Sequence, residues 1–168
     1  TELQRLIDET PENGVLDLEF DFKYNTKIDG DKFQNGVIIN KTLTIDGKGF
    51  TLDANHLNAT LVAMSKISLK DIVFINGNCT EEFSIGGYYA RGTVNVIRGS
   101  DGSTIDNCTF KDNAALMGGG VYWTSKEGTI TNTRFENNVA MRADSGSSSS
   151  TTSQGGAIYW SGANGKID

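Results

Sequence analysis

Apolar residues recur along this chain in a regular frame of isoleucines and phenylalanines separated by short polar stretches. An Ile/Leu series repeats at intervals of 24, 36, 25 and 37 residues, and a Phe series keeps step with it at 24, 36 and 25. The two series are Ile45, Leu69, Ile105, Ile130 and Ile167, and Phe50, Phe74, Phe110 and Phe135. A base period lengthened by about a dozen residues in two places is typical of a repeat protein with loop insertions.

The clearest two copies of the repeat span residues 103–123 and 128–160. Each contains a Phe followed by a polar triplet, and each closes on glycines and an aromatic strand, GGGVYW and GGAIYW. The strands are short, and no helical pattern follows residue 10. A propeller needs a longer repeat, a sandwich does not repeat its sequence, and the leucine-rich pattern is missing. The sequence therefore predicts an all-β parallel β-helix, in which Val94, Val121 and Ile158 form a third internal column.

The first residues have a different pattern from the rest. Residues 1–10 predict a short amphipathic helix, and residues 1–13 are expected to cap the open end of a β-helix formed by residues 14–168. A helix this short is marginal alone, so its apolar face must be covered. The apolar face comprises Leu3, Leu6 and Ile7, and Thr1 with Gln4 forms a predicted capping box.

Polar residues at fixed positions after each Phe predict the corners of the coils. Asn and Gly tolerate a left-handed backbone, and side-chain amides can hydrogen-bond along a stack. We therefore interpret these residues as structural rather than catalytic. They are Asn76, Asp112 and Asn137, each followed by Gly77, Asn113 or Asn138.

Charge and composition narrow the functional classes. Fifteen basic and 21 acidic residues give a net charge of −6, which disfavours nucleic-acid binding. No stretch reaches the roughly 18 apolar residues of a membrane span. We expect a signal or anchor to lie outside this segment, and the segment to be a fragment of a longer protein, because Ile167 opens another coil. His56 is expected in a surface loop, Cys108 in the core and Cys79 in a loop, without a disulfide between them.

Two motif pairs carry a family resemblance. FKDN with GGGV, and FENN with GGAI, resemble the polymorphic outer-membrane protein repeats of bacterial surface adhesins. Three longer segments resemble the adhesin-like surface proteins of methanogenic archaea. They are INKTLTIDGKGFTLDA, ISLKDIVFINGN and IDNCTFKDN. The resemblance covers roughly residues 37–168. It implies a right-handed, pectate-lyase-like parallel β-helix that is exported and displayed on the cell surface.

The carboxylates of the repeat region do not form an evident catalytic site. Asp71 and Asp106 fall in different columns, and Asp112 and Glu136 are flanked by Asn rather than by other acids. No pair has the arrangement required for acid and base catalysis, and no calcium loop is complete. We therefore expect no catalytic residue, no metal and no cofactor. A polysaccharide lyase or glycoside hydrolase stays open as the alternative, since the fold does not decide activity.

Two insertions suggest where a ligand binds. One lies between Phe74 and Val94, and the other lies between Phe135 and Ile158 and includes the Ser/Thr-rich loop 145–153. Loops on a rigid scaffold commonly carry recognition, so we expect the two insertions to form a cleft or a pair of fingers on either side of the short loop 114–117. Strand alternation predicts the Trp123 and Trp160 pair inside and an exposed tyrosine pair outside. The candidate ligand-binding residues are Tyr88, Tyr89, Arg91, Tyr122, Tyr159, Arg142 and Asp144.

The sequence thus favours a monomeric, non-catalytic adhesin module that is extracellular and binds a glycan or glycoprotein receptor on another cell, without membrane insertion in this segment. A purely structural stalk is a second alternative to the adhesin. Four N-glycosylation sequons fit an exported protein, at Asn40, Asn58, Asn78 and Asn107.

Overall fold

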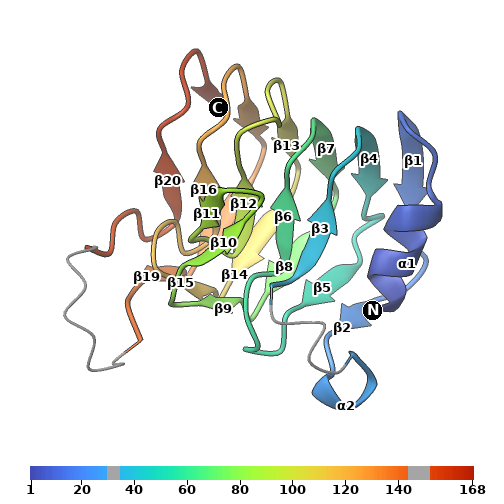
Figure 1. The fold of residues 1–168 in the computed structure, drawn as a ribbon, viewed down its shortest axis with the longest axis horizontal. Coiled ribbons are helices and arrows are strands. Elements are labelled where there is room, and N and C mark those ends of the chain that lie inside the picture. The colour runs from blue at the N-terminus through green and yellow to red at the C-terminus, as the bar shows by residue number, and fades with distance from the viewer. Residues whose placement is uncertain (30–34, 144–151) are drawn as a thin grey trace.

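The computed structural model describes residues 1–29, 35–143 and 152–168. Three parallel sheets wind around one apolar interior, and a fourth, smaller sheet lies at a corner (Figure 1). Sheet A contains β1 (Gly14–Asp17), β4 (Leu43–Asp46), β7 (Ile67–Lys70), β13 (Thr104–Asp106), β17 (Thr129–Thr131) and β21 (Lys166–Ile167), in that order. Sheet B contains β2 (Phe22–Lys23), β5 (Thr51–Asp53), β8 (Val73–Ile75), β14 (Thr109–Lys111) and β18 (Arg134–Glu136). The predicted parallel β-helix is confirmed.

Sheet C provides the third side of the coils, and sheet D is added in three of them. Sheet C contains β3 (Val37–Ile39), β6 (Leu61–Ala63), β12 (Val94–Val96), β16 (Val121–Trp123) and β20 (Ile158–Trp160). Sheet D contains β9 (Asn78–Cys79), β15 (Ala114–Ala115) and β19 (Val139–Ala140). Because successive coils add their strands to sheets A, B and C in the same order, equivalent residues of neighbouring coils lie at the strand spacing of about 4.8 Å.

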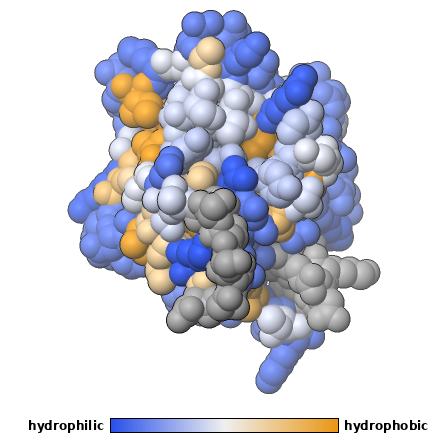
Figure 2. Space-filling model, turned by 60° about the vertical axis from the view of Figure 1, so that its left-hand side comes forward, coloured by the Kyte–Doolittle hydropathy of each residue, from blue (hydrophilic) through white to orange (hydrophobic). Residues whose placement is uncertain are grey.

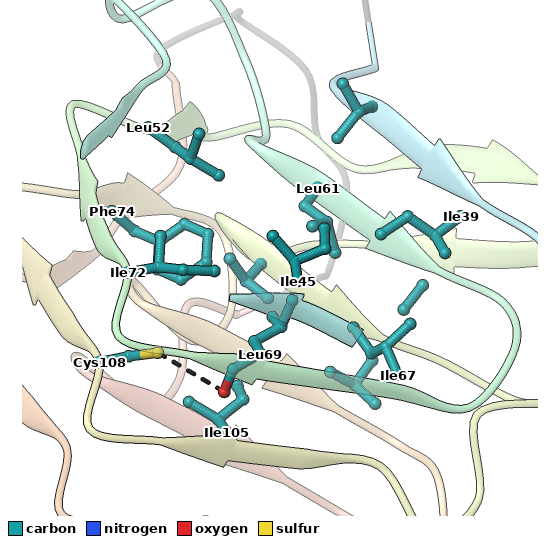
Figure 3. Close-up of a cluster of buried hydrophobic side chains, with 14 of the residues drawn as sticks. Ile39, Ile45, Leu52, Leu61, Ile67, Leu69, Ile72, Phe74, Ile105 and Cys108 are labelled. Carbon is teal, nitrogen blue, oxygen red and sulfur yellow. Dashed lines mark hydrogen bonds between the residues drawn. The ribbon is translucent and has the colours of Figure 1, made fainter. Parts of the chain in front are cut away.

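The predicted apolar columns lie inside the stack, except for Ile167 in the last strand, which is 54% exposed. Sheet A pairs Ile45, Leu69, Ile105, Ile130 and Ile167 in one row, which begins one coil earlier at Leu16. Figure 3 shows Ile45, Leu69 and Ile105 pointing into the same interior as Leu52 and Phe74. The sheet C column of Val94, Val121 and Ile158 also extends back, to Leu61 and Val37.

The phenylalanine column is correct except at its first member. Phe110 stacks between Phe74 and Phe135, with ring centroids 4.8 and 5.0 Å away. The partner of Phe74 in the preceding coil is Leu52, and Phe50 lies outside the column. The interval of 24 residues assigned Phe50 to the column wrongly, because the turn between β4 and β5 is two residues longer than the turn between β7 and β8. Phe50 therefore falls before its strand, where it is only partly buried.

The predicted corners have left-handed backbone. Asn76, Asp112 and Asn137 have φ of 58°, 55° and 53°. A second left-handed corner, between sheets A and B, is formed by Asp71, Asn107 and Asn132. Asn and Asp occupy such positions at lower cost than other residues with a Cβ, so the polar residues after each Phe are confirmed as turn-forming.

The N-terminal helix α1 (Glu2–Glu9) covers the open end of the coils, as predicted (Figure 1). Leu3 and Ile7 are fully buried, and the Thr1 side-chain hydroxyl accepts a hydrogen bond from the backbone N–H of Gln4. The Gln4 side chain does not complete a capping box. It accepts from the Ile38 N–H and donates to the Ile38 carbonyl, so it satisfies the edge of β3.

Three further findings complete the fold. A one-turn helix, α2 (Thr26–Asp29), occurs although the sequence shows no helical pattern after residue 10. Cys79 is buried in β9 rather than lying in a loop, and it is a free thiol like Cys108. Among the described residues, no helix is long and apolar enough to cross a membrane.

Candidate binding hairpin

The first insertion folds into an antiparallel hairpin of β10 (Phe83–Ile85) and β11 (Tyr88–Ala90). Gly86 and Gly87 connect the strands with φ of 56° and 81°, the geometry of a two-residue type I′ turn. A Cβ at Gly86 would collide with the end of the Met64 side chain, so the turn packs directly against sheet C. In Figure 1 the hairpin projects onto the strands of sheet C.

The inner face of the hairpin buries a second apolar cluster against the outside of sheet C. Phe83, Ile85 and Tyr88 are partly buried against it. The buried members come from the sheet, the hairpin and the short loop, and they are Val62, Ala90, Ile97, Leu116, Met117 and Tyr122. The cluster fixes the hairpin as a rigid part of the scaffold, because burial of this much apolar surface opposes its release.

Arg91 fastens the base of the hairpin. Its Nε donates to Glu82 Oε2 at 2.6 Å and its Nη1 donates to the Tyr122 hydroxyl at 3.2 Å. The guanidinium also lies 5.0 Å from the centre of the Tyr89 ring. Burial opposes its charge, but the hydrogen bonds to Glu82 and Tyr122 raise the pKa of Arg91 above its ordinary value. Ligand binding by Arg91 stays a prediction; the structure shows that its side chain is 21% exposed and also contacts Glu82 and Tyr122.

The tyrosine and tryptophan pairs face opposite sides of sheet C, as strand alternation predicted. Trp123 and Trp160 stack at 4.5 Å on the inner side, and Tyr122 and Tyr159 stack at 5.2 Å on the outer side. The predicted exposure of Tyr122 is wrong, since this residue is only 5% exposed. The hairpin covers it, and Tyr159 is partly buried beside it.

The remaining candidates divide into accessible and inaccessible groups. Tyr89 faces away from the cluster and is 51% exposed. Tyr88 is partly buried, and the Arg98 guanidinium lies 5.8 Å from its ring centre, a contact with no signal in the sequence. Arg142 is partly buried in the second insertion. Asp144 and residues 145–151 of the Ser/Thr loop lie outside the described residues.

The two insertions are joined at their bases. The Ala143 N–H donates to the Thr80 carbonyl at 3.2 Å, which links the second insertion to the first across the short coil. Met117 of the short coil forms a bridge with Gln154 and donates its N–H to the Arg91 carbonyl. Over their described residues, the insertions thus form one continuous surface rather than two separate fingers.

That surface alternates in polarity. Figure 2 shows hydrophobic residues in separate patches among hydrophilic ones on the face it presents. Over the described part of the chain, the large apolar side chains with 45% or more of their surface exposed are Val15, Phe20, Tyr89, Val139, Met141 and Ile167. Tyr89 is the only one of these that belongs to the hairpin.

Carboxylates of the coils are engaged in structural contacts. Asp46, in β4, contacts Lys48 at 2.7 Å and Lys70 at 2.8 Å, an arrangement that the sequence did not reveal. Burial disfavours its charge, but the two lysines outweigh that effect and lower the pKa of Asp46 to about 2. Asp106 accepts from Thr131 and Asn132 of the next coil. Within the described ranges, no group of three or more His, Cys, Asp or Glu side chains is placed to hold a metal ion.

Comparison with known proteins gives one family match. The Chlamydia polymorphic membrane protein repeat matches residues 132–159, which contain the FENN and GGAI motifs and run from the corner before β18 into β20. No curated protein and no solved structure matches the chain. The last complete coil is therefore similar to a repeat of the chlamydial polymorphic membrane proteins.

Proposed function

We propose that the chain is a non-catalytic adhesin module displayed on a cell surface, and that it attaches to a glycan or glycoprotein of another cell. The repeat match at residues 132–159 supports a surface protein of this kind, because the matched repeat belongs to membrane proteins. The resemblance to adhesin-like proteins of methanogenic archaea stays a hypothesis.

The observation that carries the proposal is the rigid presentation of Tyr89 on the hairpin. The ring is 51% exposed, and its hairpin is held by the Gly86–Gly87 turn and by Arg91. A tyrosine ring offers an apolar face and a polar edge, which suits stacking on a sugar ring. Because the side chain is already positioned, binding costs little ordering entropy.

The hairpin also explains why an insertion would be retained in an otherwise regular coil. The scaffold itself needs only the short connection of the neighbouring coil at β15. The longer connection adds an aromatic surface outside the apolar interior. Loops of this type on a rigid solenoid are common sites of recognition.

A glycan array and a cell-attachment assay with the purified chain test the proposal. Tyr89→Ser should weaken binding about two- to tenfold, the loss expected for one aromatic stacking contact. Val15→Ser is the matched control, because Val15 is 61% exposed but lies in β1, outside both insertions. Equal loss in both variants would contradict recognition by the hairpin, and binding by neither the wild type nor the variants would favour a structural stalk.

Polysaccharide depolymerisation assays, with and without Ca²⁺, address the enzyme alternative. The proposal expects no new reducing or unsaturated ends with pectin-like or neutral polysaccharides. Turnover that is lost with Asp46→Asn or Asp106→Asn, both of which carry lowered pKa values, would replace the adhesin proposal with a catalytic one.

A further inference from the structure

A groove of about 270 Å³ runs along the outer face of sheet A, on a different face from the hairpin. It crosses β4, β7 and β13 and the turns that precede them. Three of its residues, Thr44, Ser68 and Thr104, are register partners in successive strands. Their hydroxyls therefore recur along the groove at the strand spacing of about 4.8 Å.

The groove is lined by groups that hydrogen-bond to polyols. Thr104 Oγ1 donates to Ser68 Oγ at 3.0 Å, which leaves the Ser68 proton free to be donated. Within the described ranges, the hydroxyls of Thr42 and Thr44 have no hydrogen-bond partner in the protein. Asn13 adds a side-chain amide at one end. Hydroxyl and amide side chains that are not already satisfied can pair with the hydroxyls of a saccharide.

The charge of the groove differs from that of the whole chain. The chain has 21 acidic residues and a net charge of −6, yet no carboxylate of the described residues lines the groove. Its one charged lining residue is Lys66, which forms no ion pair with a carboxylate of the described residues. The lysine side chain lies beside Gly102, where a Cβ would be 3.6 Å from Lys66 Cε. An ammonium without a partner, among neutral hydroxyls, favours an anionic group on the ligand.

We propose that this groove binds a short saccharide that carries one anionic substituent, a carboxylate or a sulfate. Lys66 pairs with the anionic group, and the hydroxyl row of Thr44, Ser68 and Thr104 pairs with the sugar hydroxyls. The volume suits a ligand of one or two sugar rings. This site is independent of the hairpin, so it neither requires nor follows from the proposed adhesion through Tyr89.

Calorimetric titration of the full chain with three disaccharides tests the site. The probes are glucuronyl-β-1,4-glucose, cellobiose with one sulfate, and neutral cellobiose. At low salt, one or both anionic probes should bind at least about tenfold more tightly than cellobiose, as expected for one charge-assisted contact. The better of the two anionic probes identifies the substituent.

Two variants locate the binding. Lys66→Met should remove the preference for the anionic probe, whereas Lys126→Met should leave it unchanged, because Lys126 is exposed but does not line the groove. Thr104→Val should weaken all three probes, and Tyr89→Ser should weaken none. Equal affinity for charged and neutral probes, no measurable binding of any probe, or unchanged binding by Lys66→Met would each overturn the proposal.

Discussion

Asn113 provides the sharpest test of the corner ladder. It is 1% exposed at the corner between sheets B and D. Its Oδ1 accepts from the Gly77 N–H at 2.8 Å, and its Nδ2 donates to the Phe74 carbonyl at 3.1 Å and to Asn138 Oδ1 at 2.9 Å. One amide therefore connects three consecutive coils.

Asn113→Ala removes these bonds without imposing backbone strain, because Asn113 is not among the residues with positive φ. The buried Gly77 N–H loses its acceptor, which costs about 1–3 kcal/mol, and each of the two lost donor contacts costs about 0.5–1.5 kcal/mol. We therefore expect the free energy of unfolding to fall by about 2–6 kcal/mol. A loss of this size is large against the 5–15 kcal/mol stability of an ordinary domain.

Urea denaturation followed by circular dichroism measures the change, with the denaturant slope checked to be the same in both proteins. Asn137→Gly is the control, since Asn137 is exposed and its φ of 53° suits glycine. The control should lose less than about 1 kcal/mol. If Asn113→Ala loses no more than the control, the amide ladder does not stabilise the stack.

Three further perturbations probe the scaffold. Gly128→Ala should destabilise by about 1–3 kcal/mol in thermal or urea unfolding, because the new Cβ would overlap the buried Trp123 ring; an unchanged midpoint would refute this packing. Asp46 has a folded pKa of about 2 against an ordinary 3.8, so its contribution to stability is present above about pH 4 and lost as the pH falls toward 2. Asp46→Asn should flatten the pH dependence of the urea midpoint in that window, and an identical slope would count against the ion pairs. Burial raises the pKa of both Cys79 and Cys108 to about 12, so iodoacetamide at pH 8 should label neither thiol until urea unfolds the chain, and rapid native labelling would contradict their burial.

Periodicity alone was enough to predict the scaffold. Each coil contacts its neighbours through the same positions, so Ile105, Phe110 and Val121 had to recur in the sequence at the interval set by one turn of the solenoid. The corner residues could be predicted because their requirement is local: Asp112 and Asn137 have a left-handed backbone conformation that few other residues tolerate. The interval failed at Phe50, where two extra turn residues changed the count without changing the pattern of polarity.

The insertion was found from the sequence, but its path was decided by tertiary contacts. Strand alternation placed Tyr122 on the outer side of sheet C, and it could not show that a hairpin folds back over that side. The hydrogen bonds from Arg91 to Glu82 and Tyr122 depend on this fold-back. The ion pair of Asp46 with Lys70 and the groove beside Lys66 depend on the stacking of coils. A repeating contact is recorded in the sequence many times, whereas a contact made once has no period and is fixed only by the packing of distant segments.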